Sequence, residues 1–519
     1  MRAPTFALPS TSLRLFAAGC LSLVLATGAR GQELAKAPPE QLPPLVVEQT
    51  APAPTPKKTA KKRSGASGAA KASAAPAAPS STAQGLIPAA VKEVLVTPPV
   101  VEKYQLPQKS FSTTARQIEE TINLKDPEDA VKYMPSLFVR KRNDGDNQSV
   151  LATRTWGLNS SARTLIYQDD LLISALIGNN NSGASPHWNL VSPESIARID
   201  FLNGPYAAAY PGNSIGGVLL ITTKMPDKFE AAAKETVSIQ PWSQYGTRDT
   251  YVGSQTSASA GERLGAVSWF LSANFLEGPQ QPLTYTTNGR VPAGTTGTIG
   301  ALNKQGLVAN VVGTGALINT QQMAVNMKVA VDFTRFICAA SVGLWNNDQS
   351  SNPQTYLIST ATGTPTFGGV SSFANGKYTW NETHLSNAIS LKSDTRGPVD
   401  FDLSASTYNY LRDTQLNPYT VGAGTTFSQN GRVTRNDGTN WHNADAKMIW
   451  LPFGRDGPQE ISFGIHGDRY HFENPVYACP SGTARRRPAQ ASSTPKGSAR
   501  RAPEGCGRRT PGGFSATSR

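Results

Sequence analysis

The sequence predicts an α+β domain followed by an antiparallel transmembrane β-barrel, and three observations lead to this fold class. Short strand and helix signals alternate between residues 111 and 224. After residue 231, apolar and polar residues alternate with a period of two, which is typical of strands with one apolar and one polar face. The N-terminus has the pattern of an export signal, and no later apolar run reaches the roughly 18 residues of a membrane helix.

The charge of the chain is concentrated at its two ends. The 519 residues include 49 Lys and Arg and 36 Asp and Glu, for a net charge of +13. Residues 1–90 hold ten basic and three acidic residues, and residues 478–519 hold nine basic and one acidic residue, whereas residues 91–477 hold 30 basic and 32 acidic residues. A basic folded face, the usual mark of nucleic-acid binding, is missing, so we expect no nucleic-acid partner.

The first 31 residues have the order of a secretory signal peptide. Arg2 and Arg14 precede the apolar stretch Leu15–Ala26, and small residues follow as far as Gly31. Residues 32–90 are rich in Pro, Ala and Lys and lack the apolar side chains that offset the entropy of ordering. We therefore expect a disordered tether there.

The last 42 residues differ in composition from the patterned region before them. Residues 478–519 are rich in Arg, Pro and Gly, and the change comes abruptly after Tyr477. We interpret this segment as a disordered tail, and we hypothesise that it is translated out of frame.

The α+β domain is predicted from local start signals and short apolar runs. Asp126–Asp129 supplies an N-cap, a proline at the first helical position and acidic residues in the first turn, which predicts a helix ending near Tyr133. Ser192–Glu194 repeats this signal for a second short helix. Strands are expected at residues 136–140, 164–173, 199–202 and 218–222.

The alternating strands fit two architectures. Residues 323–333, 399–406 and 461–466 alternate most clearly. A barrel is favoured because the runs are about ten residues long, aromatic residues lie near the strand ends, and short turns alternate with long loops. A soluble secreted β-protein remains the alternative.

The segment Ser192–Lys224 carries the most specific motif. It resembles the end of the plug domain in TonB-dependent outer-membrane receptors of the siderophore-receptor type. A Gly-Pro pair forces a turn there, and a Gly-Gly pair allows close backbone approach before the last strand. The residues that carry the resemblance are Arg198, Gly204, Pro205, Tyr210, Gly212, Gly216 and Gly217.

Two positions depart from the pattern of that family. Asp170 replaces the glycine of the usual Asp-Gly strand end, and Thr153–Gly157 replaces an Ile-Arg-Gly segment. These differences indicate a divergent subfamily. With the resemblance, the chain divides into a signal peptide (1–31), a tether (32–90), a TonB-box region (91–109), a plug domain (110–230), a partial barrel (231–477) and a tail (478–519).

A TonB box is a short extended segment that adds a strand to the energising protein, so it needs β-branched residues and unpaired backbone. Glu93, Val94, Leu95, Val96 and Thr97 resemble such a box. Leu45–Glu48 is a rival segment ahead of the tether.

The resemblance implies capture of a scarce nutrient, most often a ferric siderophore, and uptake driven by the TonB energising complex. The implied partners are TonB, outer-membrane lipid and a small-molecule metal chelate, and the implied location is the cell outer membrane. No nucleotide motif, catalytic triad or shared histidine ligand spacing is present, so we expect no enzyme activity, no cofactor and no metal-ligating residues.

Two polar loops of the plug are candidate ligand sites. Arg140 and Arg142 belong to the first loop and could recognise an anion, although the loop could equally be a solvated turn. Asn180, His187 and Trp188 belong to the second loop. The alternative for Trp188 is packing against the barrel wall, and the alternative for His187 is a structural hydrogen bond without ligand contact.

The length conflicts with a complete barrel. Plugged outer-membrane transporters use 22 strands, or roughly 220 strand residues at about ten each. Ala231 to Tyr477 provides 247 residues, in which we expect about nine strands, so the barrel is predicted to be incomplete and unable to form a stable closed transporter. Three interpretations remain: a TonB-dependent receptor, complete or truncated; a non-functional remnant or binding-only plug fragment; and a soluble secreted β-protein.

Overall fold

The computed structural model describes residues 110–154, 163–176, 186–204, 210–455 and 457–479, together with the backbone of residues 507–508. The expected signal peptide, tether, both candidate TonB boxes, Pro205 and Asn180 lie outside the described residues, as does nearly all of the expected tail.

The plug region, residues 110–230, contains a five-stranded sheet. Its order is β1-β6-β7-β4-β5, and only the β4–β7 pair is parallel. A second pair, β2 with β3, is antiparallel. The strands are β1 (Ser110–Thr114), β2 (Leu137–Arg140), β3 (Val150–Thr153), β4 (Thr164–Gln168), β5 (Leu171–Leu172), β6 (Ile196–Asn203) and β7 (Gly217–Thr223). The predicted α+β texture of this region is confirmed.

The helices of the plug region are short. In α2 (Ala115–Thr121), the Thr114 side chain accepts from the Gln117 backbone and the Gln117 side chain accepts from the Thr114 backbone, a capping box. The helix expected to end near Tyr133 is instead the 3-10 helix η2 (Pro127–Val131). The reason is local: Pro135 disfavours helical backbone just before it, which leaves too few residues for a stable α-helix.

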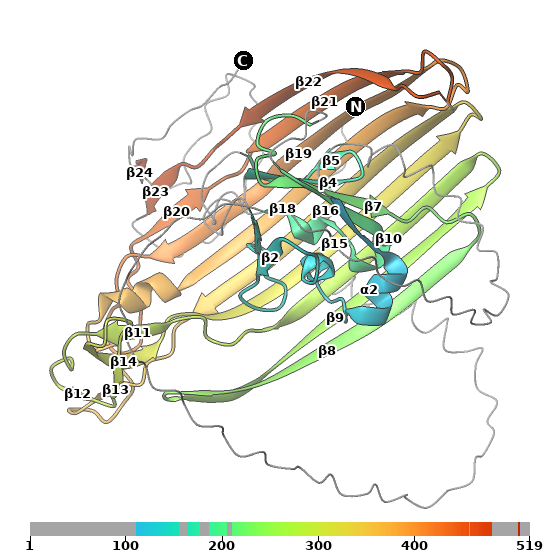
Figure 1. Ribbon diagram of the computed structural model, residues 1–519. Coiled ribbons are helices and arrows are strands. Elements are labelled where there is room, and N and C mark those ends of the chain that lie inside the picture. Colours follow the sequence, from blue (N-terminus) through green and yellow to red (C-terminus); the bar gives the residue numbers. More distant parts are fainter. Residues whose placement is uncertain are drawn as a thin grey trace, which may run out of the picture. The chain divides into compact units, whose positions relative to one another are not determined.

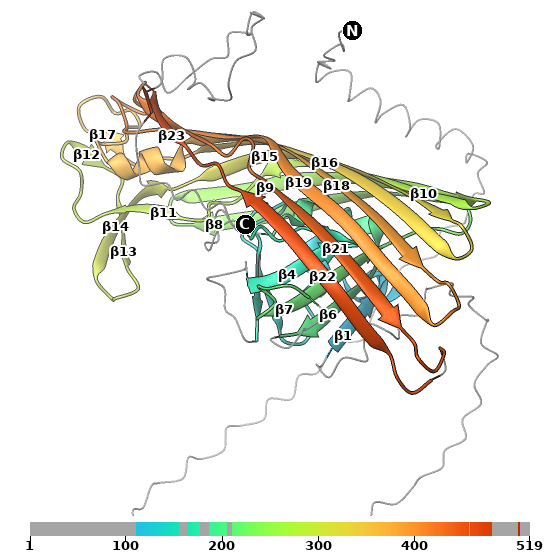
Figure 2. The same cartoon turned by 90° about the horizontal axis from the view of Figure 1, so that it is seen from above.

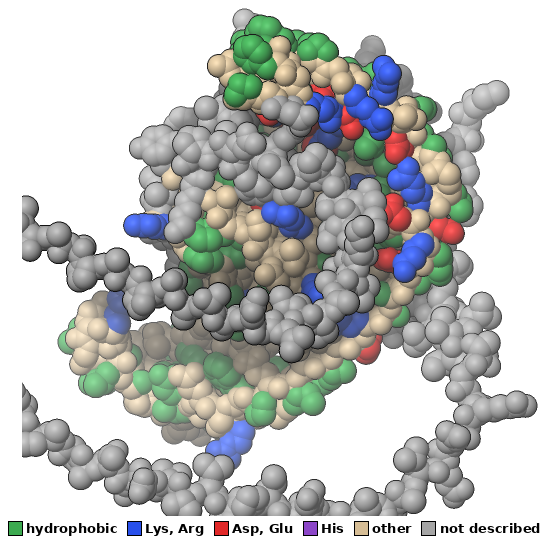
Figure 3. Space-filling model, turned by 45° about the vertical axis from the view of Figure 1, so that its right-hand side comes forward, with side chains coloured by type: hydrophobic (Ala, Val, Ile, Leu, Met, Phe, Trp, Pro, Cys, Tyr) green, Lys and Arg blue, Asp and Glu red, His purple; other side chains and the backbone are tan. Residues whose placement is uncertain are grey.

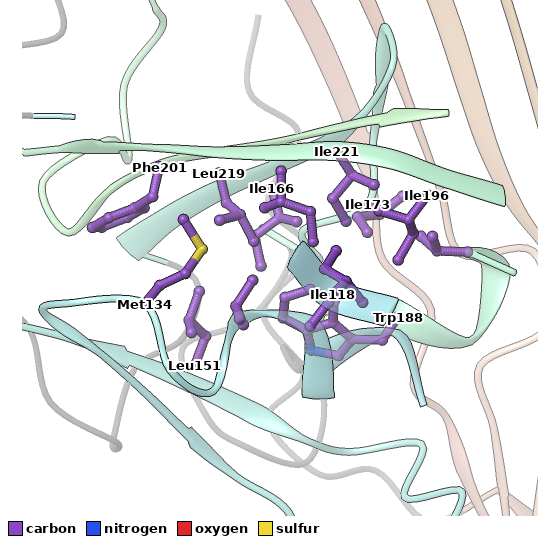
Figure 4. Packing of buried hydrophobic residues seen from close by; sticks show 14 of the residues in the cluster. Ile118, Met134, Leu151, Ile166, Ile173, Trp188, Ile196, Phe201, Leu219 and Ile221 are labelled. Carbon is purple, nitrogen blue, oxygen red and sulfur yellow. The ribbon is translucent and has the colours of Figure 1, made fainter. Parts of the chain in front are cut away.

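The core of the plug region lies between its sheet and these helices. Figure 4 shows Leu219 and Ile221 of the sheet on the side of Ile118 of α2 and Trp188, and Phe201 above Met134. Trp188 begins the 3-10 helix η4 (Trp188–Leu190), and η5 (Pro193–Ser195) follows where the second short helix was expected.

Residues 230–479 contribute most of a second sheet of twelve strands, all paired antiparallel (Figure 1). Nine of them have 11 or more residues, in agreement with the expected nine: β8 (Glu230–Gln244), β9 (Thr247–Leu264), β10 (Val267–Pro279), β15 (Leu317–Asp332), β16 (Phe336–Asn352), β18 (Tyr378–Ser393), β19 (Val399–Pro418), β21 (Asn440–Trp450) and β22 (Ile461–His471). The other three are β20 (Gly431–Arg435), β23 (Val476–Cys479) and β24 (Gly507–Arg508).

This long sheet is a single curved layer and not a pair of facing sheets (Figure 2). Strand β19 pairs with β20 through its last residues and with β21 through its first ones. Among the described strands, β8 pairs only with β9, and β22 pairs only with β21. The layer is therefore barrel-like but incomplete, as the sequence predicted.

Short elements gather at one end of the long sheet. They are β11 (Tyr285–Asn288), β12 (Thr295–Thr296), β13 (Ile299–Leu302), β14 (Val308–Thr314), β17 (Ile358–Ser359) and η6 (Ser371–Gly376). A small buried cluster that includes Val312 of β14, Phe373 of η6 and Phe367 packs β14 against η6. Within the described residues, no helix has the length and apolar character needed to cross a membrane.

Candidate functional site

The candidate site is the interface between the plug region and the long sheet. We call the face of the long sheet that contacts the plug region the plug-facing surface. Polar side chains from consecutive long strands are buried there, including Gln322, Asn347, Glu382 and His384. Buried polar groups are stable only when they are hydrogen-bonded, so their partners define how the interface is held together.

Four amide hydrogen bonds join residues 141–149, a loop of the plug region, to residues 280–281 and to the plug-facing surface. The loop accepts three of them and donates one. Gln280 donates to the Asp144 carbonyl at 2.8 Å, Gln281 to the Arg142 carbonyl at 3.2 Å, and Gln322 to the Gly145 carbonyl at 2.5 Å. Asn147 donates to Glu382 Oε2 at 2.7 Å. The three glutamine donors are neutral and donate to main-chain oxygens. Gln280 and Gln281 directly follow β10, and Gln322 belongs to β15.

Two ion pairs join the turn between β4 and β5 to the sheet. Asp170 pairs with Lys392 at 2.8 Å, and Asp169 pairs with Lys328 at 3.1 Å. Asp169 has a φ of +51°, a left-handed conformation that Asp tolerates better than most residues. Asp170 stands where the plug motif usually has glycine, and its carboxylate binds Lys392 of β18.

Three acidic residues of the plug region surround the Lys141 ammonium. Lys141 forms ion pairs with Asp126 and, at 3.1 Å, with Asp129. Glu128 is fully buried and accepts from the Ser149 hydroxyl at 2.7 Å. Burial raises the pKa of Glu128 to about 8, and the Asp126 charge adds to that rise. Burial alone would lower the pKa of Lys141, but the charges of the three carboxylates raise it.

The two candidate arginines differ in their surroundings. Arg140 is exposed at the end of β2. The Arg142 guanidinium forms an ion pair with buried Asp146, and its Nε lies 2.9 Å from Asp146 Oδ2. Arg142 therefore orders its own loop and is half-buried, whereas Arg140 is exposed.

His187 lies in a buried aromatic cluster that joins the plug region to β18, β19 and β21. Its Nε2 is 2.6 Å from the Tyr410 hydroxyl, and its ring stacks on Tyr408 with centroids 4.8 Å apart. Trp441 closes the cluster by donating to the Leu172 carbonyl at 3.0 Å. Burial lowers the pKa of His187 to about 3, so the imidazole is neutral at physiological pH.

Trp188 does not lie on a ligand-facing loop. It is 1% exposed, packs in the core of the plug region, and donates from Nε1 to the Ser149 carbonyl at 3.1 Å. The geometry corrects the expectation for this residue: the 3-10 turn directs its large apolar ring inward, where burial is most favourable. For His187, the structure shows a buried hydrogen bond to the Tyr410 hydroxyl, which is the alternative to ligand contact.

The plug motif is explained by close backbone approach. A Cβ at Gly204 would lie 2.2 Å from the Ile215 carbonyl oxygen, and a Cβ at Gly216 would lie 2.3 Å from Thr164 Oγ1. Gly217 has a φ of +136°, which side chains rarely adopt, whereas a Cβ at Gly212 would meet nothing within 4 Å.

The polar members of the motif pair within the plug region. Arg198 bonds to Asp200 at 2.6 Å and to Ser112 of β1 at 2.9 Å, which ties β6 to its neighbour. The Tyr210 ring lies 6.3 Å from that of Tyr167. These contacts are structural, since they lie within the plug region and the Arg198 contact joins β6 to β1 of its five-stranded sheet.

Sequence reasoning missed one group of residues on the plug-facing surface. Glu382, His384 and Asp413 are all buried, and one ligand atom from each lies within 4.8 Å of the others. Glu382 and His384 are two positions apart and so share one face of a strand, which was a weak signal in the sequence. Asp413 joins them only through the pairing of β18 with β19.

Comparison with known proteins identifies the N-terminal part of this fold. Residues 102–218 match the family model of the TonB-dependent Receptor Plug Domain. No curated protein matches the chain in sequence. Residues 102–218 are thus similar to a TonB-dependent receptor plug domain, and an incomplete antiparallel barrel-like sheet follows them.

Three solved structures of bacterial siderophore receptors are similar to part of this chain. The ferric yersiniabactin uptake receptor FyuA of Yersinia pestis has a TM-score of 0.48 and 10% identity over 72% of this chain and 58% of its own. The ferric enterobactin receptor PfeA of Pseudomonas aeruginosa has a TM-score of 0.42 and 14% identity over 73% and 57%. The pyoverdine receptor FpvA of P. aeruginosa has a TM-score of 0.46 and 12% identity over 72% and 48%. The chain thus spans less than two thirds of these receptors.

Proposed function

We propose that this protein is a TonB-dependent outer-membrane receptor that takes up a scarce nutrient, of the ferric siderophore class, using energy delivered by TonB. The observation that carries the proposal is the reversed polarity of the long sheet. Its face toward the plug is polar, and its opposite face is apolar.

Strands β10, β15 and β16 show this reversal most clearly. Leu271, Met327 and Val342 are opposite one another across the three strands and are 42%, 45% and 42% exposed. Beside Leu271, Ser272 points the other way and is 1% exposed. In Figure 3, hydrophobic side chains gather along the outer side of the curved wall of strands. A water-soluble sheet buries its apolar face, whereas a membrane barrel turns it toward lipid.

The substrate class rests on the plug-domain resemblance. Arg140 and Asn180 remain the proposed ligand-binding residues, with Arg140 the charged one that is open to solvent. Such a residue suits the anionic groups of metal chelates, because a guanidinium binds carboxylate and phenolate oxygens through charge-assisted hydrogen bonds.

The experiment has a structural arm and a functional arm. Outer-membrane fractions from cells that express the full chain are run on gels with and without boiling. A band that shifts on boiling supports an inserted barrel. A protein in the membrane fraction that never shifts supports the remnant or plug-fragment alternative, and a protein recovered in the soluble fraction supports the secreted β-protein.

The functional arm measures growth on single ferric siderophores, with and without the gene. Proline at Leu95 removes a backbone donor and should abolish growth on the transported compound if Glu93–Thr97 is the TonB box. The matched control is proline at Val46, in the rival segment. Growth that depends on the gene but survives both substitutions would contradict TonB-driven uptake through either box.

A further inference from the structure

We propose that Glu382, His384 and Asp413 form a binding site for one divalent first-row transition-metal ion of the Zn²⁺ type. The site lies on the plug-facing surface, in β18 and β19. It is separate from the proposed ligand loops, and it does not depend on which nutrient the receptor carries.

The two carboxylates are held opposite each other on adjacent strands. Glu382 is paired in register with Asp413, so their side chains lie on the same face. They are only 4% and 2% exposed. Within the described residues, no Lys or Arg forms an ion pair with either carboxylate. The neighbouring Arg412 lies on the opposite face of β19, where its side chain donates to Asn381 of β18. Two buried carboxylates facing each other repel unless a cation or a proton lies between them.

His384 directs an unused nitrogen toward this pair. Its Nδ1 lies 3.0 Å from the Tyr408 hydroxyl, whereas its fully buried Nε2 has no hydrogen-bond partner and lies 3.9 Å from Asp413 Oδ2. A buried polar atom without a partner is costly. When Nδ1 carries the proton and donates it to Tyr408, the Nε2 lone pair faces a carboxylate oxygen of Asp413. The two groups then repel each other, whereas both would be attracted to a metal ion placed between them.

The surrounding donors already orient both carboxylates. Trp380 Nε1 donates to Asp413 Oδ1 at 2.7 Å, and Asn347 donates to Glu382 Oε2 at 2.7 Å. Ligand residues in metal sites are typically fixed by such outer hydrogen bonds. The register of β18 and β19 shifts between Thr383 and His384, an irregularity that re-aims side chains.

The ligand set selects the type of ion. One imidazole and two carboxylates suit Zn²⁺ and its first-row neighbours, whereas Ca²⁺ and Mg²⁺ prefer oxygen ligands alone. Three protein ligands leave a fourth position of a tetrahedral ion for water. Because Asn147 of the plug also donates to Glu382 Oε2, the ion would sit one hydrogen bond away from the plug.

The test uses the untagged full chain in detergent micelles, freed of metal with a chelator and titrated with Zn²⁺ in a calorimeter. We expect one equivalent to bind, with no corresponding heat from Ca²⁺. Glu382→Gln, His384→Gln and Asp413→Asn should each weaken binding at least tenfold, and the two amides keep the oxygens that Asn347 and Trp380 address. The matched control is His466→Gln, a histidine already within 3.3 Å of Asp445 and Asp468, which should bind as the unaltered chain does.

A spectroscopic readout guards against variants that fail to fold. Zinc-edge X-ray absorption of the unaltered chain should show only nitrogen and oxygen ligands at about 2.0–2.2 Å. Absence of stoichiometric Zn²⁺ binding by the unaltered chain would overturn the proposal in favour of a proton shared by the two carboxylates. Loss of binding in His466→Gln but not in His384→Gln would overturn it in favour of a site at His466.

Discussion

Trp188 offers the sharpest test of the plug core, because the structure places it in that core and not on a ligand-facing loop. The perturbations are Trp188→Ala and Trp188→Phe. The alanine variant empties a site that is 1% exposed, and such truncations of a buried tryptophan cost about 3–5 kcal/mol. The phenylalanine variant keeps most of the apolar contact but leaves the Ser149 carbonyl without the indole donor 3.1 Å away, at a cost of about 1–3 kcal/mol.

The assay is hydrogen–deuterium exchange of peptides from β4 and β7 in the full chain, since these two strands form the parallel pair of the plug sheet. A loss of about 1.4 kcal/mol speeds exchange from the open state tenfold. Trp188→Ala should therefore exchange faster by a factor on the order of 10² to 10⁴. Trp188→Phe should lie between it and the unaltered chain.

The matched control is Trp450→Phe, because Trp450 is 42% exposed in β21. Such a surface change should alter stability by no more than about 0.5 kcal/mol, or roughly a factor of two in exchange. If Trp188→Ala exchanged no faster than the control while nutrient binding was lost, Trp188 would be a ligand residue and the core assignment would be refuted.

Three further predictions concern the plug domain. Because burial raises the pKa of Glu128 from 4.5 to about 8, the folded state holds a proton that the unfolded state releases. The free energy of unfolding should then fall by up to about 1.4 kcal/mol per pH unit as the pH rises between these two pKa values. Chemical denaturation of Glu128→Gln should show a flatter pH dependence. An equally steep pH dependence in that variant would contradict the raised pKa of Glu128. Gly217→Ala, at a φ of +136°, should lower the thermal stability of the plug by about 2 kcal/mol or more, whereas Gly212→Ala should change it by less than about 0.5 kcal/mol; equal effects would remove the steric explanation. Lys392→Met removes a partly exposed partner of Asp170 and should loosen the plug by about 1 kcal/mol or less in low salt, with a smaller effect at 1 M salt in the same exchange experiment.

The fold was largely predictable because strand periodicity is a local property. The alternation in residues 323–333 predicts a strand with two unlike faces, and β15 shows it. The choice of barrel over sandwich needed strand length and loop pattern as well. The helix expected to end near Tyr133 was too long because a start signal does not specify how far a helix continues.

The interface was less predictable because it depends on pairing between distant segments. Asp170 stood out as an unusual residue, but nothing local points to Lys392, which lies 222 residues later. Glu382 and His384 share a strand face by spacing alone, whereas Asp413 reaches them through register and a bulge. A 3-10 turn likewise gives no sequence signal that would show Trp188 facing inward.

The amide contacts on the loop of residues 141–149 have a mechanical consequence. Gln280, Gln281 and Gln322 each donate to a different main-chain oxygen, and none of these three bonds leaves a charge behind when it opens. Each contributes about 0.5–1.5 kcal/mol, and water can replace it as soon as it breaks. A pulling force on the chain would therefore meet a series of low barriers along this loop.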